Sequence, residues 1–134
     1  MIGVIDYKAG NAPSVVNALR KLGIDCELVS TPEKLQGLAG VILPGVGSAS
    51  ATIASLAELG FLAELEDFVL RKQRPFLGIC VGMQILFEHS EELDTKCLGW
   101  LKGRVRRFPP EVRVPQIGWN RVSFTYGHPL AAGI

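Results

Sequence analysis

The sequence predicts an α/β fold in which a doubly wound, mostly parallel open sheet is covered by helices on both faces. Short apolar runs at residues 2–6, 25–29, 41–43 and 74–79 have the length and composition of buried strands. Segments with apolar residues at helical spacing separate these runs. Strands that alternate with helices form parallel sheets, because each connection has to return the chain to the same end of the sheet.

The helices are predicted from spacing and from their end signals. Apolar residues at helical spacing within residues 15–22, followed by a glycine, indicate the first helix and its end. A hydroxyl residue before a proline and a glutamate predicts a short helix from residues 30–33. Further helices are expected over residues 49–60 and 62–71, and one over residues 83–88 behind the fourth strand.

The last part of the chain has a different pattern. Between residues 98 and 124, short strand-like runs at residues 101–108 and 121–124 alternate with glycine and proline. This pattern predicts antiparallel hairpins at one edge of the sheet or over its ends. No composition change marks a boundary, so residues 1–134 are interpreted as one domain.

Composition and charge narrow the function classes. The chain has 134 residues, 48% hydrophobic and 20% charged, as is typical of a globular domain with a real core. A net charge of +1 gives no electrostatic footprint for nucleic acid, and the basic stretch at residues 102–107 lacks stacking aromatics, so we interpret it as a solvated face. No apolar run is long enough to span a bilayer, and no secretion signal precedes the first strand. We therefore expect neither a nucleic-acid nor a membrane partner.

Cysteine and histidine usage points to a reduced compartment. The chain has three cysteines, an odd number, and no Cys-x-x-Cys pair, so a cytoplasmic location fits better than a disulfide scaffold. Its two histidines are far apart in sequence and offer little material for a zinc site. We expect no metal and no other cofactor.

The most informative residue is Cys80. It stands at the centre of residues 78–82, Gly-Ile-Cys-Val-Gly, between a predicted strand and a predicted helix. The pattern repeats the Gly-x-Ser-x-Gly nucleophile elbow with sulfur in place of oxygen, and glycines flank it because the nucleophile sits on a strained corner. At a helix start, the dipole favours thiolate over thiol. The alternative is a buried structural cysteine, which the flanking glycines disfavour.

Two further loops are expected to meet the elbow. In open α/β sheets ligands bind outside the carboxyl ends of the strands. Residues 7–11 and 44–48 follow strands at this edge and are rich in glycine or small polar residues. Backbone N–H groups of residues 44–48, with the N–H of Val81, would form an oxyanion hole. The alternative for Pro-Gly-Val-Gly at residues 44–47 is an ordinary turn.

A thiol that attacks a carboxamide also needs a general base, usually a histidine oriented by a carboxylate. We expect His89 on the elbow helix, about two and a half turns beyond Cys80, pointing away from the strand end. His128 lies in a turn before a short apolar stretch. The sequence therefore offers a nucleophile and no well-placed base.

Four motifs occur in order along the chain. They are Asp-Tyr-x-Ala-Gly-Asn at residues 6–11, Pro-Gly-Val-Gly at 44–47, Gly-Ile-Cys-Val-Gly-Met-Gln at 78–84 and Val-Pro-x-x-Gly-Trp-Asn at 114–120. Together they resemble the glutaminase subunits of imidazole glycerol phosphate synthase, which are class I (triad) glutamine amidotransferases with a flavodoxin-like sheet. The elbow alone indicates only the wider amidotransferase class, and the first and last motifs narrow it to this subunit.

The resemblance implies a role for each matching residue. Cys80 would form a glutamyl thioester, and Gly47 and Gln84 would hold the glutamine. Val46, Gly47 and Val81 would supply the oxyanion hole. The implied activity is therefore hydrolysis of glutamine to release ammonia.

The resemblance also implies a partner. Ammonia would pass to a (β/α)8-barrel cyclase subunit in histidine biosynthesis, across a face that includes Gly10, Asn11, Trp119 and Asn120. Large aromatic residues often anchor interfaces, and the alternative for Trp119 is a core position.

One part of the family pattern has no match. The family's catalytic histidine and its glutamate lie near the C-terminus, beyond residue 134, so the chain would be the N-terminal two thirds of a glutamine amidotransferase domain, with the sheet incomplete at its C-terminus. We expect these residues alone to lack glutaminase activity and to expose a sheet edge or a bare apolar face. Two alternatives stay open: a non-catalytic remnant that keeps the partner face, and another cysteine-elbow α/β protein such as a DJ-1-like hydrolase or chaperone.

Overall fold

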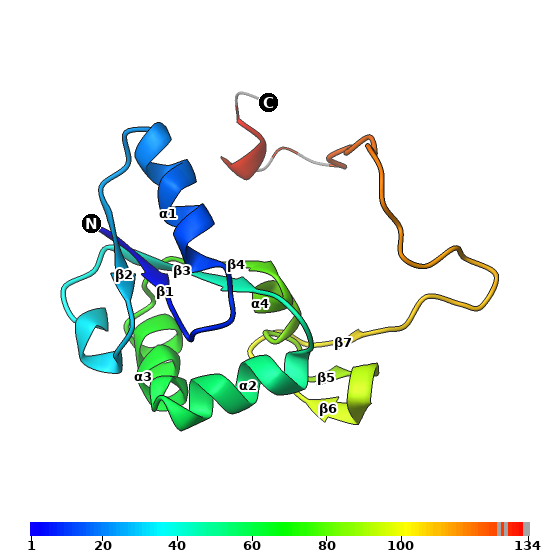
Figure 1. Cartoon of the computed structure of the whole chain (residues 1–134), viewed down its shortest axis with the longest axis horizontal. Coiled ribbons are helices and arrows are strands. Elements are labelled where there is room, and N and C mark those ends of the chain that lie inside the picture. The colour runs from blue at the N-terminus through cyan, green and yellow to red at the C-terminus, as the bar shows by residue number, and fades with distance from the viewer. Residues whose placement is uncertain (126, 128, 133–134) are drawn as a thin grey trace.

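A four-stranded parallel sheet forms the centre of the domain. The computed structural model describes residues 1–125, 127 and 129–132. Strands β1 (Ile2–Ile5), β2 (Cys26–Val29), β3 (Gly40–Gly45) and β4 (Phe76–Cys80) lie in the order β2-β1-β3-β4 (Figure 1). All neighbouring strands are parallel, which confirms the predicted fold class. The winding direction changes between β1 and β3, the place where ligand sites form in such sheets.

One face of the sheet is covered by α1 (Ala12–Lys21), which lies above the strands in Figure 1. Pro13 stands in its first turn, where a missing backbone N–H is not costly. The buried cluster on this side is small and consists of Val4, Ala12 and Val16. The helix confirms the prediction from spacing at residues 15–22.

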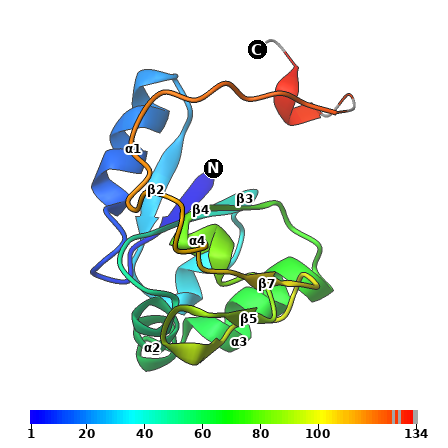
Figure 2. The ribbon, with the colours of Figure 1, turned by 90° about the vertical axis from the view of Figure 1, so that its right-hand side faces the viewer.

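The opposite face carries the main core. Helices α2 (Ala49–Glu58) and α3 (Phe61–Glu66), with the π-helical segment η2 (Asp67–Arg71), lie below the sheet (Figures 1 and 2). The hydroxyl of Ser48 accepts a hydrogen bond from the Ala51 N–H at 3.2 Å and so caps α2. The fully buried members of this core include Ile5, Leu43, Leu56, Phe61 and Leu65.

No helix within residues 1–125 and 129–132 is long and apolar enough to cross a membrane.

A small second sheet follows the elbow helix α4 (Val81–Gln84). Strand β5 (His89–Ser90) lies between β6 (Thr95–Lys96) and β7 (Arg104–Val105), antiparallel to β6 and parallel to β7. The hairpins predicted within residues 98–124 are not formed, because β7 is the one strand in that range and it pairs in parallel with β5. Within the described residues, the remaining secondary structure consists of the 3₁₀ turns η1 (Pro32–Leu35), η3 (Glu92–Asp94) and η4 (Pro129–Ala131).

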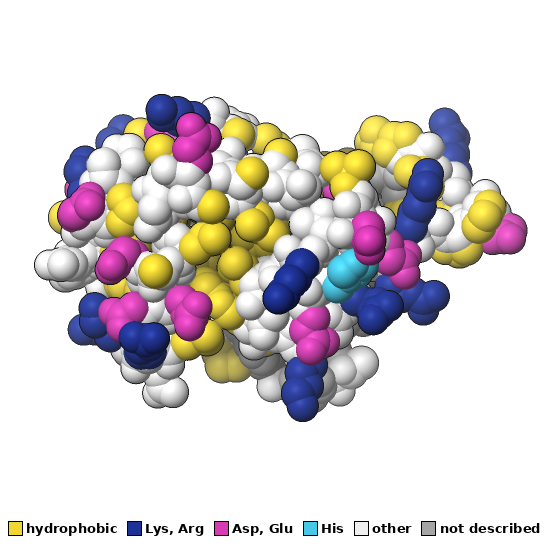
Figure 3. All heavy atoms as spheres, turned by 90° about the horizontal axis from the view of Figure 1, so that it is seen from below, with side chains coloured by type: hydrophobic (Ala, Val, Ile, Leu, Met, Phe, Trp, Pro, Cys, Tyr) yellow, Lys and Arg dark blue, Asp and Glu magenta, His cyan; other side chains and the backbone are white. Residues whose placement is uncertain are grey.

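Beyond β7 the chain forms an extended arm, residues 106–125, whose residues are all exposed. Residues 121–124 lie in this arm and form no strand, which corrects the prediction made from their alternating pattern. A period of two stabilises a strand only where a neighbouring strand and a core are present to receive it. Figure 3 shows hydrophobic and charged side chains next to one another on the projecting arm at the right.

Candidate functional site

Cys80 is the last residue of β4 and lies at the corner where this strand turns into α4. Its backbone has φ 55° and ψ −115°, a conformation that costs about 1–3 kcal/mol for a residue with a side chain. The thiol is exposed. An exposed thiol on a strained strand–helix corner has the geometry of a nucleophile elbow, and a structural cysteine would be buried instead.

Three glycines allow α4 to lie directly on the strands. A Cβ at Gly82 would collide with the carbonyl oxygen of Leu43, and a Cβ at Gly45 would collide with the backbone nitrogen of Gly82. A Cβ at Gly78 would lie 2.5 Å from the carbonyl oxygen of Gly82. These are contacts with backbone, so no side-chain rotation can relieve them. The elbow pattern reveals the need for glycine at 78 and 82, but not at 45, which belongs to another strand.

Helix α4 is shorter than the sequence predicts. It ends at Gln84, so the prediction of a helix over residues 83–88 is wrong for most of that range. The carbonyl groups of Ile85, Leu86 and Phe87, which a longer helix would use internally, accept hydrogen bonds of 2.8–2.9 Å from backbone N–H groups within residues 98–101. The dipole of a four-residue helix is also smaller than the dipole expected for the longer one.

The residues predicted for the oxyanion hole flank the same corner. Strand β3 runs to Gly45, two residues beyond its predicted end, and Gly45 lies opposite Cys80 in the ladder. Val46 and Gly47 therefore leave the sheet directly beside the nucleophile, and Val81 follows it in sequence. Gly47 has φ 80°, and a Cβ there would meet no atom within 4 Å. The positive φ, rather than crowding within the protein, is what requires glycine at position 47.

The loop after β1 packs against the same end of β3. A Cβ at Gly10 would lie 2.7 Å from the carbonyl oxygen of Pro44 and 2.7 Å from the ring of Tyr7. Tyr7 is buried, and its hydroxyl lies 3.4 Å from that of Thr52 in α2. Asn11 is exposed at the start of α1 with φ 54°. Gly10 thus holds the loop to β3, while Asn11 faces solvent.

A cavity of about 690 Å³ opens beside the elbow helix, and Gln84 is part of its wall. Its walls carry charges of both signs. The backbone N–H of Arg107 donates to Glu91 Oε2 at 2.8 Å, and Arg106 Nε lies 3.7 Å from Glu91 Oε1. The other lining residues are Ser90, Glu92, Leu93, Val105, Phe108 and Val114.

Sequence reasoning missed this cavity. Residues 102–107 were interpreted as a solvated basic face because they lack stacking aromatics, and this criterion does not detect an acidic partner. The pairing of β5 with β7 brings residues 91–92 next to residues 105–107, and two-residue strands leave almost no periodic signal. The one available signal was the pair of adjacent glutamates shortly after the elbow.

His89 is not placed as a base for Cys80. His89 lies in β5 rather than on the elbow helix, which corrects its predicted position. Its Nε2 lies 2.9 Å from Asp94 Oδ1, and its Nδ1 is buried without a hydrogen-bond partner. No hydrogen bond joins it to Cys80 in the described part of the chain. His128 lies outside the described residues.

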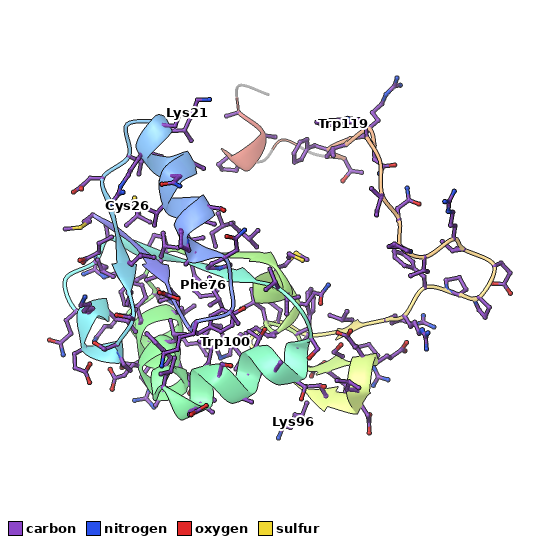
Figure 4. The ribbon with its side chains drawn as sticks, in the orientation of Figure 1. Lys21, Cys26, Phe76, Lys96, Trp100 and Trp119 are labelled. Atoms are coloured by element: carbon purple, nitrogen blue, oxygen red, sulfur yellow. The ribbon has the colours of Figure 1, made fainter. Side chains whose placement is uncertain are left out.

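The arm carries the other half of the predicted partner face. The side chain of Trp119 is completely exposed, at 105% of its reference area, and Figure 4 shows it away from the sheet. The core alternative for this residue is therefore wrong. Asn120 Nδ2 donates to the Gly118 carbonyl at 3.4 Å. Trp119 is thus not brought into contact with Gly10 or Asn11.

The other two cysteines differ from Cys80 in exposure. Cys26 is half-buried and Cys97 is buried, and this burial raises the pKa of the Cys97 thiol. In residues 1–125, 127 and 129–132, no group of three or more His, Cys, Asp or Glu side chains is arranged to hold a metal ion.

Comparisons with known proteins agree with the resemblance that the sequence motifs indicate. The profile of the SNO glutamine amidotransferase family matches residues 9–110. Imidazole glycerol phosphate synthase subunit HisH of Dehalococcoides mccartyi (strain ATCC BAA-2266 / KCTC 15142 / 195) is 46% identical, over 100% of this chain and 65% of that protein. The HisH subunit of Xylella fastidiosa (strain Temecula1 / ATCC 700964) is 48% identical, over 99% of this chain and 66% of that protein.

A solved structure adds a likeness of fold. The crystal structure of a glutamine amidotransferase superposes with a TM-score of 0.69 at 28% identity, covering 79% of this chain and 56% of that one. The chain spans about 65% of the length of the first curated relatives it matches.

The glycine contacts beneath α4 can be tested by Gly82→Ala. Its methyl group would meet the Leu43 carbonyl, so the elbow must shift, and we expect a loss of about 2–4 kcal/mol in the free energy of unfolding measured in urea. Met83→Ala, at a neighbouring and 47% exposed position, is the control and should change stability by less than about 1 kcal/mol. Equal stabilities for the two variants would contradict the close backbone contact.

Proposed function

Because the chain belongs to the SNO glutamine amidotransferase family, we propose that it carries the nucleophile and part of the substrate site of a glutaminase, the glutamine-hydrolysing subunit of imidazole glycerol phosphate synthase. The observation that carries this proposal is the corner at Cys80. Its thiol is exposed, its φ is 55°, and Gly45 lies opposite it in the ladder. The three motif-bearing loops after β1, β3 and β4 all leave the carboxyl edge of the sheet.

In the proposed reaction, the sulfur of Cys80 attacks the side-chain carbonyl carbon of glutamine. A C–S bond forms, and the carbonyl oxygen becomes an anion that the N–H of Val81 and those of the Val46–Gly47 loop stabilise. The C–N bond then breaks, and the nitrogen takes a proton and leaves as ammonia. Water hydrolyses the remaining glutamyl thioester to glutamate and restores the thiol.

The cavity beside Gln84 suits the other end of the substrate. Glutamine carries an ammonium and a carboxylate group, and the cavity wall offers the carboxylates of Glu91 and Glu92 together with the side chains of Arg106 and Arg107. Charge-assisted hydrogen bonds to both groups would select a free amino acid over a neutral amide. Its size is also within the usual range for a small-molecule site.

The proton acceptor for Cys80 is proposed to come from outside these residues. His89 is paired with Asp94, and the matched relatives are longer than this chain. A non-catalytic role in partner binding is the second candidate function, and the lack of a described base beside Cys80 is the observation that favours it.

For the complete enzyme we propose a (β/α)8-barrel cyclase as partner, which receives the ammonia, and a cytoplasmic location. Gly10, Asn11, Trp119 and Asn120 are proposed to form the contact. Exposed Asn11 and completely exposed Trp119 are available for such a contact. Because Trp119 lies on the arm, the arm would have to settle on the partner or beside the loop after β1 when the complex forms.

A chloroketone analogue of glutamine tests the pocket directly. We expect it to alkylate Cys80, with glutamine protecting the thiol, as peptide mass mapping would show. The matched Cys80→Ser chain should take up little label, because Cys97 is buried with a raised pKa and Cys26 is half-buried. Labelling at the rate of plain chloroacetamide, without protection by glutamine, would instead support the non-catalytic role.

Gly47→Ala tests the oxyanion loop, and Gly37→Ala is its matched control. Both glycines have φ near 80° and open space at the Cβ position, so both variants should lose about 1 kcal/mol of stability. Only Gly47→Ala should slow analogue labelling of Cys80, by about tenfold or more if one oxyanion donor is displaced. Equal labelling rates would show that residues 44–47 form an ordinary turn.

Trp119→Ala tests the partner face. Titration calorimetry with the cyclase subunit should show affinity weakened by about 2 kcal/mol, the usual loss at an aromatic hot spot. The melting temperature should not change, because the side chain is completely exposed. Ile117→Ala, a neighbouring arm position that is 84% exposed, is the control and should weaken binding less. Unchanged affinity for Trp119→Ala would remove this residue from the proposed contact.

A further inference from the structure

A tight turn, residues 91–94, joins β5 to β6 and forms part of the wall of the charged cavity. Glu91, Glu92 and Leu93 all line this cavity. The two strands have two residues each and pair in an antiparallel register. A hairpin this short is not rigid by itself, so the position of the two carboxylates depends on the contacts that side chains make within the turn.

Two consecutive residues of this turn have a left-handed backbone. Leu93 has φ 55° and Asp94 has φ 46°. Aspartate tolerates this conformation, whereas leucine rarely adopts it. Leu93 is also 73% exposed, so burial of its side chain does not offset the strain. Backbone strain of this kind persists only where the surrounding contacts hold it in place.

Two hydroxyl groups hold the first half of the turn. The Ser90 hydroxyl accepts a hydrogen bond from the Glu92 N–H at 3.3 Å, and the Thr95 hydroxyl donates to the Glu92 carbonyl at 2.9 Å. The Thr95 hydroxyl has a single proton, so its contact of 3.4 Å with the Leu93 carbonyl is secondary. Neither hydroxyl therefore anchors the strained half of the turn, residues 93–94.

The side chain of His89 supplies this anchor. Its Nε2 lies 2.9 Å from Asp94 Oδ1. Because a carboxylate only accepts hydrogen bonds, Nε2 must carry the proton. The other ring nitrogen, Nδ1, is buried and has no hydrogen-bond partner among the residues that the structure describes. Within these residues, the contact with Asp94 thus fixes the orientation of the ring, and the ring fixes Asp94.

We propose that His89 and Asp94 are positioning residues, because their contact holds the 91–94 turn and so keeps the carboxylates of Glu91 and Glu92 on the cavity wall. Neither side chain is proposed to touch the substrate. The effect on substrate binding rests on the proposed glutaminase function, whereas the position of the turn does not. The Asp94 side chain is 98% exposed, and exposed ion pairs add little to global stability, so the contact should act on the turn and not on folding.

Two backbone amides report the position of the turn without any substrate. The Arg107 N–H donates to Glu91 Oε2 at 2.8 Å, and the Gly103 N–H donates to Glu88 Oε2 at 2.9 Å. Glu91 belongs to the turn, whereas Glu88 precedes it. In His89→Leu, NMR should show the Arg107 amide exchanging with solvent about threefold faster or more, while the Gly103 amide keeps its rate.

His89→Gln is the matched control, because its side-chain N–H can donate to Asp94 in place of the ring. It should keep the exchange rate of the Arg107 amide near that of the unmodified chain. If circular dichroism shows that His89→Leu is unfolded, Asp94→Gly replaces it, since glycine removes the acceptor and accepts the positive φ. Asp94→Asn, which keeps an acceptor oxygen, is then the control.

Labelling of Cys80 by the chloroketone analogue of glutamine measures the effect on the cavity. In His89→Leu, the analogue concentration that gives half the maximal labelling rate should rise about fivefold or more, because displaced carboxylates bind the ammonium group less well. The maximal rate should not change, since the elbow itself is intact. His89→Gln should label as the unmodified chain does.

Three results would each overturn the proposal: an Arg107 amide that His89→Leu leaves unaffected, equal effects of His89→Leu and His89→Gln, or a neutral His89 ring whose ¹H–¹⁵N correlations place the proton on Nδ1. Faster exchange of the Arg107 amide in His89→Leu, together with a Cys80 thiol that does not prefer the analogue to chloroacetamide in the unmodified chain, would reject the glutaminase function and support the placement of the turn.

Discussion

The backbone of α4 touches the backbones of β3 and β4 with no side chain between them, since Gly45, Gly78 and Gly82 contribute only hydrogen atoms to the contact. The sharp turn at Cys80 follows from this contact, because a helix that begins so close to its own strand cannot be reached by a relaxed backbone. The strain at this corner is balanced by packing. Val81 and Ile85 are buried in the main core and hold the turn in place.

The same contact determines where the other loops lie at the carboxyl edge of the sheet. Because α4 lies on the end of β3, the residues leaving β3 start beside the thiol, and the loop after β1 closes over Pro44 from the other side. The carbonyl groups beyond α4 are then bound by residues 98–101, which brings the small second sheet next to the elbow. The charged cavity beside Gln84 is thus a consequence of where the elbow helix stops.

The main features of the fold could be predicted from the sequence because they depend on local patterns. The apolar runs of β1 to β4 and the helical spacing of α1 to α3 are strong signals, and the elbow is recognisable from its two glycines. The length of α4 was not predictable, since residues 83–88 have a helical pattern that is overridden by hydrogen bonds from residues 98–101. Residues 121–124 were misinterpreted for the opposite reason, because no strand lies beside their alternating pattern in the part of the chain that the structure describes.

The candidate site also has parts that could be predicted from the sequence and parts that could not. Cys80 and the loop of Val46 and Gly47 could be located from sequence, since motif and strand order bring them to one edge. The acidic and basic walls of the cavity could not, because the register of two-residue strands decides which charges meet. The surroundings of His89 were also beyond prediction, since its pairing with Asp94 depends on the tight turn between β5 and β6.

The two sides of the parallel sheet are held with very different strength. Among the described residues, fifteen buried residues form the cluster below the sheet and three form the cluster under α1, so detachment of α1 would expose the smaller cluster. Partial opening in proteins follows such differences, and the α1 layer should form a separate unit of low local stability. The loop that carries Gly10 and Asn11 runs directly into this helix. A molecule that binds this loop would therefore also stabilise α1 against local unfolding. Part of the binding free energy would then be observed as reduced mobility of α1.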